Sequence, residues 1–174
     1  KLILNKKNLG VAKSRNIAIQ KCRGEFISFI DADDIWKPRK LEKQIKIMIK
    51  KQAEISYTSY HIIDDNDKRI NTRNVSNTIS YNKLIKSCEI GLSTVVVRRK
   101  IFRILKFPNL KTQEDFALWL KLIRLKVNFL PINKTLSYWR KAENSLSSNS
   151  LASLSSIIPP CNFKLTFEAS ESIW

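Results

Sequence analysis

The chain has 174 residues, enough for one domain with a buried core, and its apolar content of 43% argues against a disordered protein. Lysine and arginine number 32 against 15 acidic residues, so the formal net charge of +17 predicts an anionic partner: nucleic acid, an acidic lipid surface or a phosphorylated small molecule. Three widely spaced cysteines and a single histidine argue against a zinc site and a Cys/His nucleophile. No apolar run approaches the roughly 20 residues of a membrane span, and no signal-peptide pattern is visible.

The first half of the chain predicts strands alternating with helices. We expect a strand at residues 1–4, a helix from about Val11 to Cys22 and a strand at residues 25–30. Pro38 suits the first turn of a lysine-rich amphipathic helix over residues 37–51. Further strands are expected at residues 55–63 and 93–98. The alternation indicates an α/β fold with a mostly parallel central sheet flanked by helices.

The second half predicts one more long helix, from about Gln113 to Lys126, with Phe116 and Trp119 on its apolar stripe. Two short extended pieces follow, at residues 127–132 and 136–140. Beyond Asn144 the chain becomes rich in serine and then reaches a Pro-Pro pair. We therefore expect a folded domain over residues 1–149 and a Ser/Pro-containing tail over residues 150–174.

Three aspartates end the strand at residues 25–30, in the stretch FISFIDADDIW (26–36). Ligands of an open α/β sheet gather beyond the carboxyl ends of its strands. Asp31 and Asp33 repel each other there unless a cation compensates, and hard oxygen ligands of this kind suit Mg²⁺ or Mn²⁺ shared with substrate phosphates. The alternative is a helix cap near Pro38, which is the preferred interpretation of Asp34 alone.

Three sequence blocks carry a resemblance to a known family. The first, NLGVAKSRNIAIQKCRGEFISFIDADDIWKPRKLEKQI (8–45), resembles the N-x-G helix, GE strand and D-A-D-D-x-W-x-P-x-K-L segment of glycosyltransferase family 2, which has the GT-A fold. The second places Glu114 and Asp115 before Trp119, similar to the ED-x-x-LW element of that family. The third is YWRKAENSLSSN (138–149). The resemblance covers about residues 1–149.

The resemblance implies a role for each matched side chain. Asp33 would be the metal ligand, and Asp31 would contact the nucleotide or support the ion. Arg15 would lie near the nucleotide, although it could equally pair with a local acid. Asp115 would be the catalytic base with Glu114 as a helper, although Thr112 to Asp115 also has the spacing of a helix capping box.

The implied function is that of an inverting, metal-assisted glycosyltransferase of bacterial surface-polysaccharide or lipopolysaccharide synthesis. It would move a hexose from a nucleotide-diphosphate sugar to a hydroxyl of a saccharide or lipid-linked saccharide. Arg140 and Ser145 could touch phosphate, and Trp36 and Trp119 are expected in the core. Family members normally open with a strand, a helix and a second strand that hold the nucleotide, so the resemblance also implies an N-terminally truncated domain.

Two other interpretations remain open at the level of sequence. One is a non-catalytic basic module that binds nucleic acid, but no RNP, KH, zinc-finger or helix-turn-helix signature is visible, so we expect no specific nucleic acid. The other is peripheral contact of the helix over residues 37–51 with an anionic membrane, which is compatible with catalysis. We expect a cytoplasmic protein, free or at the inner face of the plasma membrane.

Overall fold

The computed structural model describes residues 2–141, which form one six-stranded sheet with helices on both of its faces. No helix in this part of the chain is long and apolar enough to cross a membrane. The elements follow one another in this order: α1 (Val11–Lys21), β1 (Phe26–Ser28), β2 (Ile35–Trp36), α2 (Lys40–Lys50), β3 (Ile55–Ile63), β4 (Arg69–Arg73), α3 (Tyr81–Lys86), the 3-10 helix η1 (Leu92–Thr94), β5 (Val96–Arg98), α4 (Ile101–Ile104), α5 (Glu114–Arg124) and β6 (Phe129–Arg140).

The strand order in the sheet is β1-β5-β3-β6-β2, with β4 paired to β3 beside β5. The predicted α/β class is confirmed, but the prediction of a mostly parallel sheet is wrong at the level of neighbouring strands. Of the five pairings in residues 2–141, only β3 with β6 is parallel. The cause is an inserted strand: β5 runs antiparallel to both β1 and β3, which themselves point the same way. The strands β1 and β3 are therefore parallel in direction, as expected, but they are not neighbours in the sheet.

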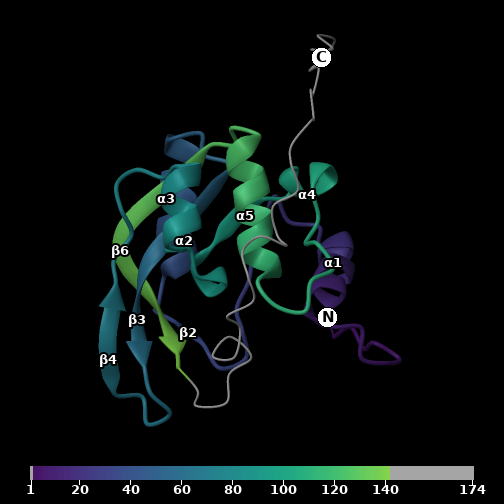
Figure 1. Cartoon of the computed structure of the whole chain (residues 1–174), viewed down its shortest axis with the longest axis horizontal. Helices are drawn as coiled ribbons and strands as arrows, with labels where there is room; N and C mark the ends of the chain where they lie inside the picture. Colours follow the sequence, from purple (N-terminus) through teal and green to yellow (C-terminus); the bar gives the residue numbers. More distant parts are fainter. Residues whose placement is uncertain (1, 142–174) are drawn as a thin grey trace.

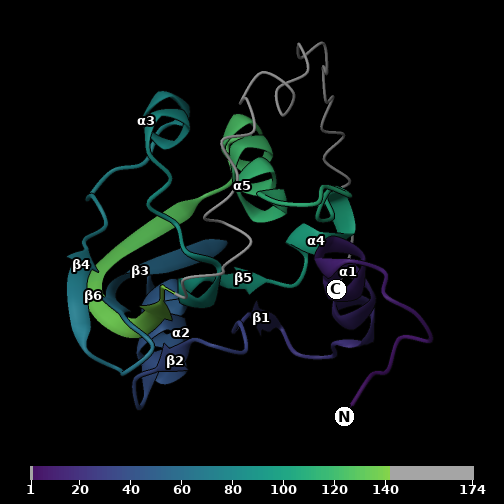
Figure 2. The same cartoon turned by 60° about the horizontal axis from the view of Figure 1, so that its bottom comes forward.

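Helices cover both faces of the sheet (Figures 1 and 2), and a hydrophobic core lies on each face. The larger core packs α5 and α3 against one face and includes the fully buried Trp119 and Tyr57. The smaller packs α2 against the other face through Met48, Ala53 and Val96. Figure 2 shows α3 and α5 above the sheet and α2 below it. This three-layer arrangement places the starts of the long helices and the ends of β1, β3 and β6 around one edge.

Several elements differ from expectation in their extent. Residues 2–4 form no strand, and Leu2 and Leu4 are exposed. The two extended pieces expected near residues 127–140 are one continuous strand, β6, and the segment expected as a strand from Ser93 begins as η1. β2, β4 and α3 are not predicted from the sequence because they are short or polar. The predicted tail over residues 150–174 lies outside the described residues.

Candidate active site

The carboxyl ends of β1, β3 and β6 meet at one edge of the sheet because these strands point the same way. β1 leads into Asp31, Asp33 and Asp34. β6 ends at Arg140, which joins the three strand ends. Its Nε donates to the Asp33 carbonyl at 3.1 Å, its Nη1 donates to the Asp64 carbonyl at 2.6 Å after β3, and its Nη2 donates to the Asp67 carboxylate at 2.5 Å. The guanidinium thus anchors the acidic loop to its neighbours.

Arg15 of α1 joins the acidic loop to the start of α5. Its Nη2 donates to Asp31 Oδ1 at 2.9 Å, and its Nη1 makes a short ion pair with Glu114 Oε1. The guanidinium also lies over the Phe107 ring, with 5.7 Å between its central carbon and the ring centre. Sequence reasoning named all three charged residues but not this bridge. The prediction that Arg15 pairs with a local acid describes its contacts in the structure.

Asp33 differs from Asp31 and Asp34 in its exposure. It is exposed, and within residues 2–141 its carboxylate makes no hydrogen bond or ion pair. Asp31 is partly exposed and has one oxygen, Oδ1, engaged by Arg15. The two carboxylates therefore retain unused oxygen ligands at the sheet edge.

Asp34 is buried, and it ties three segments together. Its Oδ1 accepts from the Arg140 N–H at 3.0 Å, and the Ser93 hydroxyl donates to the same carboxylate. Ser93 in turn accepts from the Asp31 N–H at 3.0 Å. Burial raises the pKa of Asp34 to about 6, against the opposing effect of these hydrogen bonds. The helix-cap interpretation of Asp33 and Asp34 is wrong, because the cap position of α2 is Arg39.

Glu114 and Asp115 open α5 and face the same edge. Glu114 is buried in its ion pair with Arg15. Asp115 is partly exposed, and its Oδ1 accepts from the Phe116 N–H at 2.7 Å. Burial and then the neighbouring Glu114 charge raise the pKa of Asp115 to about 6, while Arg15 acts in the opposite direction. The capping-box interpretation is wrong, because Gln113 is the cap residue and no side chain caps this helix.

Other motif residues hold the site in place. The Asn16 side chain donates to the Phe107 carbonyl at 2.9 Å and accepts from its N–H at 3.0 Å. Trp36 Nε1 donates to the Ser93 carbonyl at 2.7 Å. Trp119 is buried in the larger core, as expected. Sequence reasoning missed Ser93, whose contacts with the acidic loop carry no motif signal. Ser145 lies outside the described residues.

The donor set fits a divalent cation that shares its ligands with a substrate. Among residues 2–141 no three His, Cys, Asp or Glu side chains cluster to form a closed metal site. Mg²⁺ is commonly held by one or two carboxylates plus substrate phosphates. The free carboxylate of Asp33 and the unengaged oxygen of Asp31 provide such a partial set.

A separate cleft of about 260 Å³ lies at the opposite end of β1. It is lined by Glu25 and by four cationic residues, Arg98, Arg99, Lys100 and Arg103. Two of the cations are compensated, Arg98 by Glu25 and Lys100 by Glu54. Because Glu25 precedes β1 and Asp31 follows it, this cleft is distinct from the acidic edge and contains no pair of carboxylates.

Comparison with known proteins gives a consistent result. The sequence pattern of "Glycosyl transferase family 2" matches residues 1–107. The chain is 36% identical over 155 residues to the Escherichia coli UDP-Glc:alpha-D-GlcNAc-diphosphoundecaprenol beta-1,3-glucosyltransferase WfgD, covering 88% of the chain and 60% of WfgD. It is 32% identical over 147 residues to the E. coli enzyme WfaP, which has the same activity in its name, covering 83% of the chain and 57% of WfaP. The chain thus spans somewhat more than half the length of these relatives.

Among solved structures, the fold is similar to that of residues 1–349 of Staphylococcus aureus TarS in complex with UDP-GlcNAc. The TM-score is 0.62 at 20% sequence identity, and the match covers 81% of the chain and 42% of that TarS fragment. At this identity the likeness concerns the fold, and it confirms the GT-A expectation.

Proposed function

The chain belongs to glycosyltransferase family 2, and from this premise we propose that it transfers a sugar from a nucleotide-diphosphate sugar to an acceptor hydroxyl with inversion at the anomeric carbon. One observation carries the proposal. Arg15 brings Asp31 of the loop after β1 within one ion-pair network of Glu114, the residue before Asp115. This ion-pair network supports a site for a phosphorylated donor beside a candidate base.

On the donor side, Asp33 and Asp31 would hold Mg²⁺ or Mn²⁺ against the diphosphate. When bound, such an ion would offset the negative charge that develops on the departing nucleoside diphosphate. Arg15 keeps Asp31 oriented by its bond to Oδ1. Arg140 holds the backbone of Asp33 at its carbonyl, so that the Asp33 side chain projects from a fixed loop.

On the acceptor side, Asp115 would take the proton of the attacking hydroxyl. The acceptor oxygen forms a bond to the anomeric carbon, the bond from that carbon to the diphosphate oxygen breaks, and the proton moves to the Asp115 carboxylate. A base works well when its pKa lies close to but below the working pH. The pKa of Asp115, raised to about 6, meets that requirement at neutral pH.

The named relatives suggest the substrate class. WfgD and WfaP are named for transfer of glucose from UDP-Glc to an N-acetylglucosamine linked through diphosphate to undecaprenol. We propose substrates of this kind for the chain: a UDP-hexose and a saccharide or lipid-linked saccharide of surface-polysaccharide synthesis. The exposed lysines of α2 and the exposed Ile49 support peripheral contact of this helix with an anionic membrane that carries the acceptor.

The direct test is a transfer assay with a panel of nucleotide sugars that includes UDP-glucose and with an N-acetylglucosaminyl-diphosphate lipid as acceptor. Both the release of nucleoside diphosphate and the glycosylated product are measured. We expect metal-dependent transfer that falls at least 100-fold in Asp115→Asn. The matched control is Asp65→Asn, an exposed aspartate after β3, which should retain full activity. Equal activity of Asp115→Asn and the wild type would exclude Asp115 as the base.

A further inference from the structure

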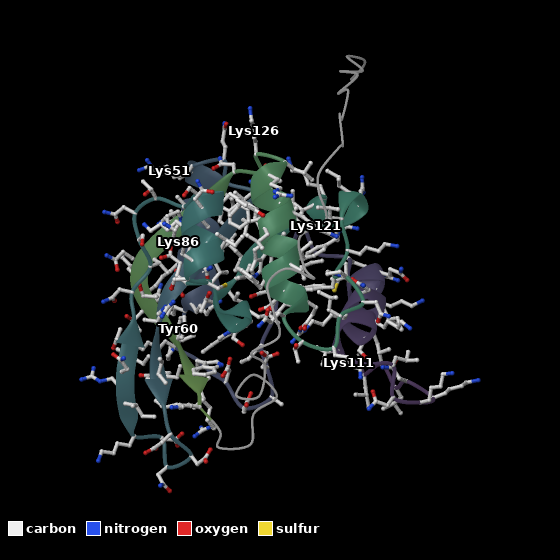
Figure 3. The ribbon with its side chains drawn as sticks, viewed as in Figure 1. Lys51, Tyr60, Lys86, Lys111, Lys121 and Lys126 are labelled. Atoms are coloured by element: carbon white, nitrogen blue, oxygen red, sulfur yellow. The ribbon has the colours of Figure 1, made fainter. Side chains whose placement is uncertain are left out.

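The cleft at the start of β1 takes no part in the proposed reaction. This cationic cleft is lined by Glu25, Arg98, Arg99, Lys100 and Arg103. It lies where β1 begins, β5 ends and α4 begins, and Arg98 Nε donates to the Ala53 carbonyl at 3.0 Å, in the segment between α2 and β3. In Figure 3, Lys51 of that segment and the ribbon of α4 lie in the upper part of the view, above Tyr60 of β3.

The charges of the cationic cleft are only partly balanced. Arg98 makes a short ion pair with Glu25, and Lys100 Nζ lies 2.8 Å from Glu54 Oε1. In the described part of the chain, Arg99 and Arg103 make no ion pair. Four cations are thus set against two carboxylates, and two positive charges remain uncompensated. A cleft lined by charges of one sign raises the local concentration of counter-ions.

Two of the guanidinium groups are anchored from behind. Arg99 Nε donates to the Gly24 carbonyl at 2.8 Å, while its two Nη atoms make no hydrogen bond with the residues that the structure describes. The central carbon of the Arg98 guanidinium lies 4.8 Å from the centre of the Phe26 ring. A guanidinium that is held at Nε presents its remaining donors in a fixed fork, which suits two-point binding of phosphate oxygens.

The size and composition of the cationic cleft favour a small anion over a nucleic acid. Its volume is about 260 Å³, and its lining residues include no aromatic side chain on which a base could stack. Its single carboxylate, Glu25, is engaged by Arg98, so a phosphate would be bound by the cations directly and without a metal ion. The two uncompensated positive charges equal the charge of a phosphate dianion in magnitude.

We propose that the cationic cleft binds a phosphate group, with Arg99 and Arg103 as its principal ligands. The site is separate from the metal-dependent donor site at the acidic edge, and the inference does not depend on the proposed function. Inorganic phosphate and the headgroup of a phospholipid both offer this chemistry, so the experiment has to distinguish these two sources.

The test is calorimetric titration of inorganic phosphate into the 174-residue chain at low ionic strength and without divalent metal. We expect binding that weakens at least tenfold in the double variant Arg99→Gln, Arg103→Gln. The matched control, Lys68→Gln with Arg69→Gln, removes two exposed cations at the start of β4, and its affinity should equal that of the wild type.

A single variant guards against loss of the fold, because Arg99 also holds the Gly24 carbonyl. Arg103 is exposed and makes no hydrogen bond or ion pair with a described residue, so Arg103→Gln should keep the wild-type thermal stability. We expect this change alone to weaken phosphate binding at least threefold. Unchanged phosphate affinity in Arg103→Gln and in a folded double variant would overturn the inference.

A second titration distinguishes the two sources of phosphate. Glycerophosphoglycerol is the soluble headgroup of phosphatidylglycerol, and its binding at least as tightly as inorganic phosphate would assign the cationic cleft to a lipid headgroup. Weaker binding of glycerophosphoglycerol would assign it to a free phosphate. Equal losses of phosphate affinity in the double variant and its control would indicate attraction to total charge and would overturn the inference, as would no phosphate binding by the folded wild-type chain.

Discussion

Arg15 connects the acidic loop after β1 with the start of α5. The Arg15 side chain is 18% exposed, and its guanidinium binds Asp31 through one nitrogen and Glu114 through another. The pair of bonds uses the fork geometry that lysine lacks. Arg15 also lowers the pKa of Asp115 against the effect of burial. Its charge therefore bears on the proton-accepting group as well as on the acidic loop.

We predict that the pH profile of transfer reports this coupling. Asp115 must be unprotonated to accept a proton, so kcat/KM should rise as the pH passes through about 6 and level off above it. In Arg15→Gln the cation that lowers the Asp115 pKa is lost, and the rising limb should move to higher pH. The measurement is kcat/KM from pH 5 to 9 for both proteins. If the rise in kcat/KM occurred at the same pH in Arg15→Gln and the wild type, Arg15 would have no effect on the pKa of Asp115.

Asp115 should also reduce the stability of the protein at neutral pH. Because its pKa is raised from 3.8 to about 6, the folded state binds its proton more tightly than the unfolded state, so stability falls as the pH rises from about 4 to 6. Two pKa units correspond to at most about 3 kcal/mol. We expect Asp115→Asn to unfold at higher urea concentration than the wild type at pH 8, with the difference shrinking toward pH 4. The exposed control Asp65→Asn should show no such gain, and a less stable Asp115→Asn at pH 8 would refute the argument.

The sequence predicts that acidic residues gather at the site, but it does not predict which contacts each of them makes. The sequence presents Asp31 and Asp33 as candidate ligands and Asp34 as a candidate helix cap, but the environment of each carboxylate is set by packing. Ser93 and the Arg140 N–H bury and bind Asp34, while Asp33 stays exposed. Ser93 lies 62 residues from Asp31 and Arg140 lies 106 residues from Asp34 along the chain, so local sequence carries no signal for these contacts.

In helix α2 the buried residues differ from those that the sequence pattern predicts. Its sequence predicts an apolar face with lysines elsewhere, yet Lys40 and Gln44 are buried on the same face as Met48, and Ile49 is 56% exposed. Lys40 Nζ lies 4.4 Å from the centre of the Trp36 ring and has no hydrogen-bond partner within residues 2–141. Burial lowers the pKa of Lys40 to about 7.

The buried ammonium leads to a prediction about stability and pH. The unfolded chain keeps the Lys40 proton up to about pH 10.5, whereas the folded state releases it near 7, so this residue makes stability rise with pH between those values. Lys40→Met removes the buried charge at the expense of the contact with Trp36. We expect the free energy of unfolding of Lys40→Met to exceed that of the wild type by about 2 kcal/mol at pH 6.5. Between pH 6.5 and 9.5 the stability of the variant should rise less than that of the wild type.

The control is Lys43→Met, an exposed lysine on the same helix, whose stability should follow the wild type at both pH values. Urea denaturation provides the measurement. A Lys40→Met variant less stable than the wild type at pH 6.5 would mean that the ammonium has a compensating partner in solution.

The elements themselves were predicted where their periodicity is strong. β3 spans the expected residues 55–63, and the limits of α1, α2 and α5 lie within three residues of those expected. The sequence could not reveal that β5 separates β1 from β3, because strand neighbours are set by long-range pairing. It also could not join the pieces around residues 133–135, where the polar run Asn-Lys-Thr interrupts the strand pattern and the pairing of β6 with β3 shifts register.

At the scale of the whole molecule, charge is distributed unevenly. The acidic edge contrasts with a net charge of +17, and α2 exposes cations on the sheet face opposite α3 and α5. Attraction of exposed lysines to anionic lipid contributes about 1 kcal/mol per residue near the surface and is screened by salt.

We predict that binding to phosphatidylglycerol vesicles is salt-sensitive and depends on α2. The triple variant Lys43→Gln, Lys46→Gln and Lys50→Gln should lose at least tenfold in affinity in a flotation assay. The matched control changes three exposed lysines of α3 and α5 on the other face: Lys83, Lys86 and Lys121 to glutamine. Equal losses in both triple variants would indicate attraction to total charge and not to a docking face.

The central claim is that the acidic edge holds a metal-bound nucleotide, and calorimetric titration of UDP with and without Mn²⁺ tests it most directly. We expect binding by the wild-type chain that requires Mn²⁺, is lost in Asp33→Ala and persists in the exposed control Asp65→Ala. Binding of UDP that is independent of Mn²⁺, or equal in Asp33→Ala and the wild type, would contradict the account.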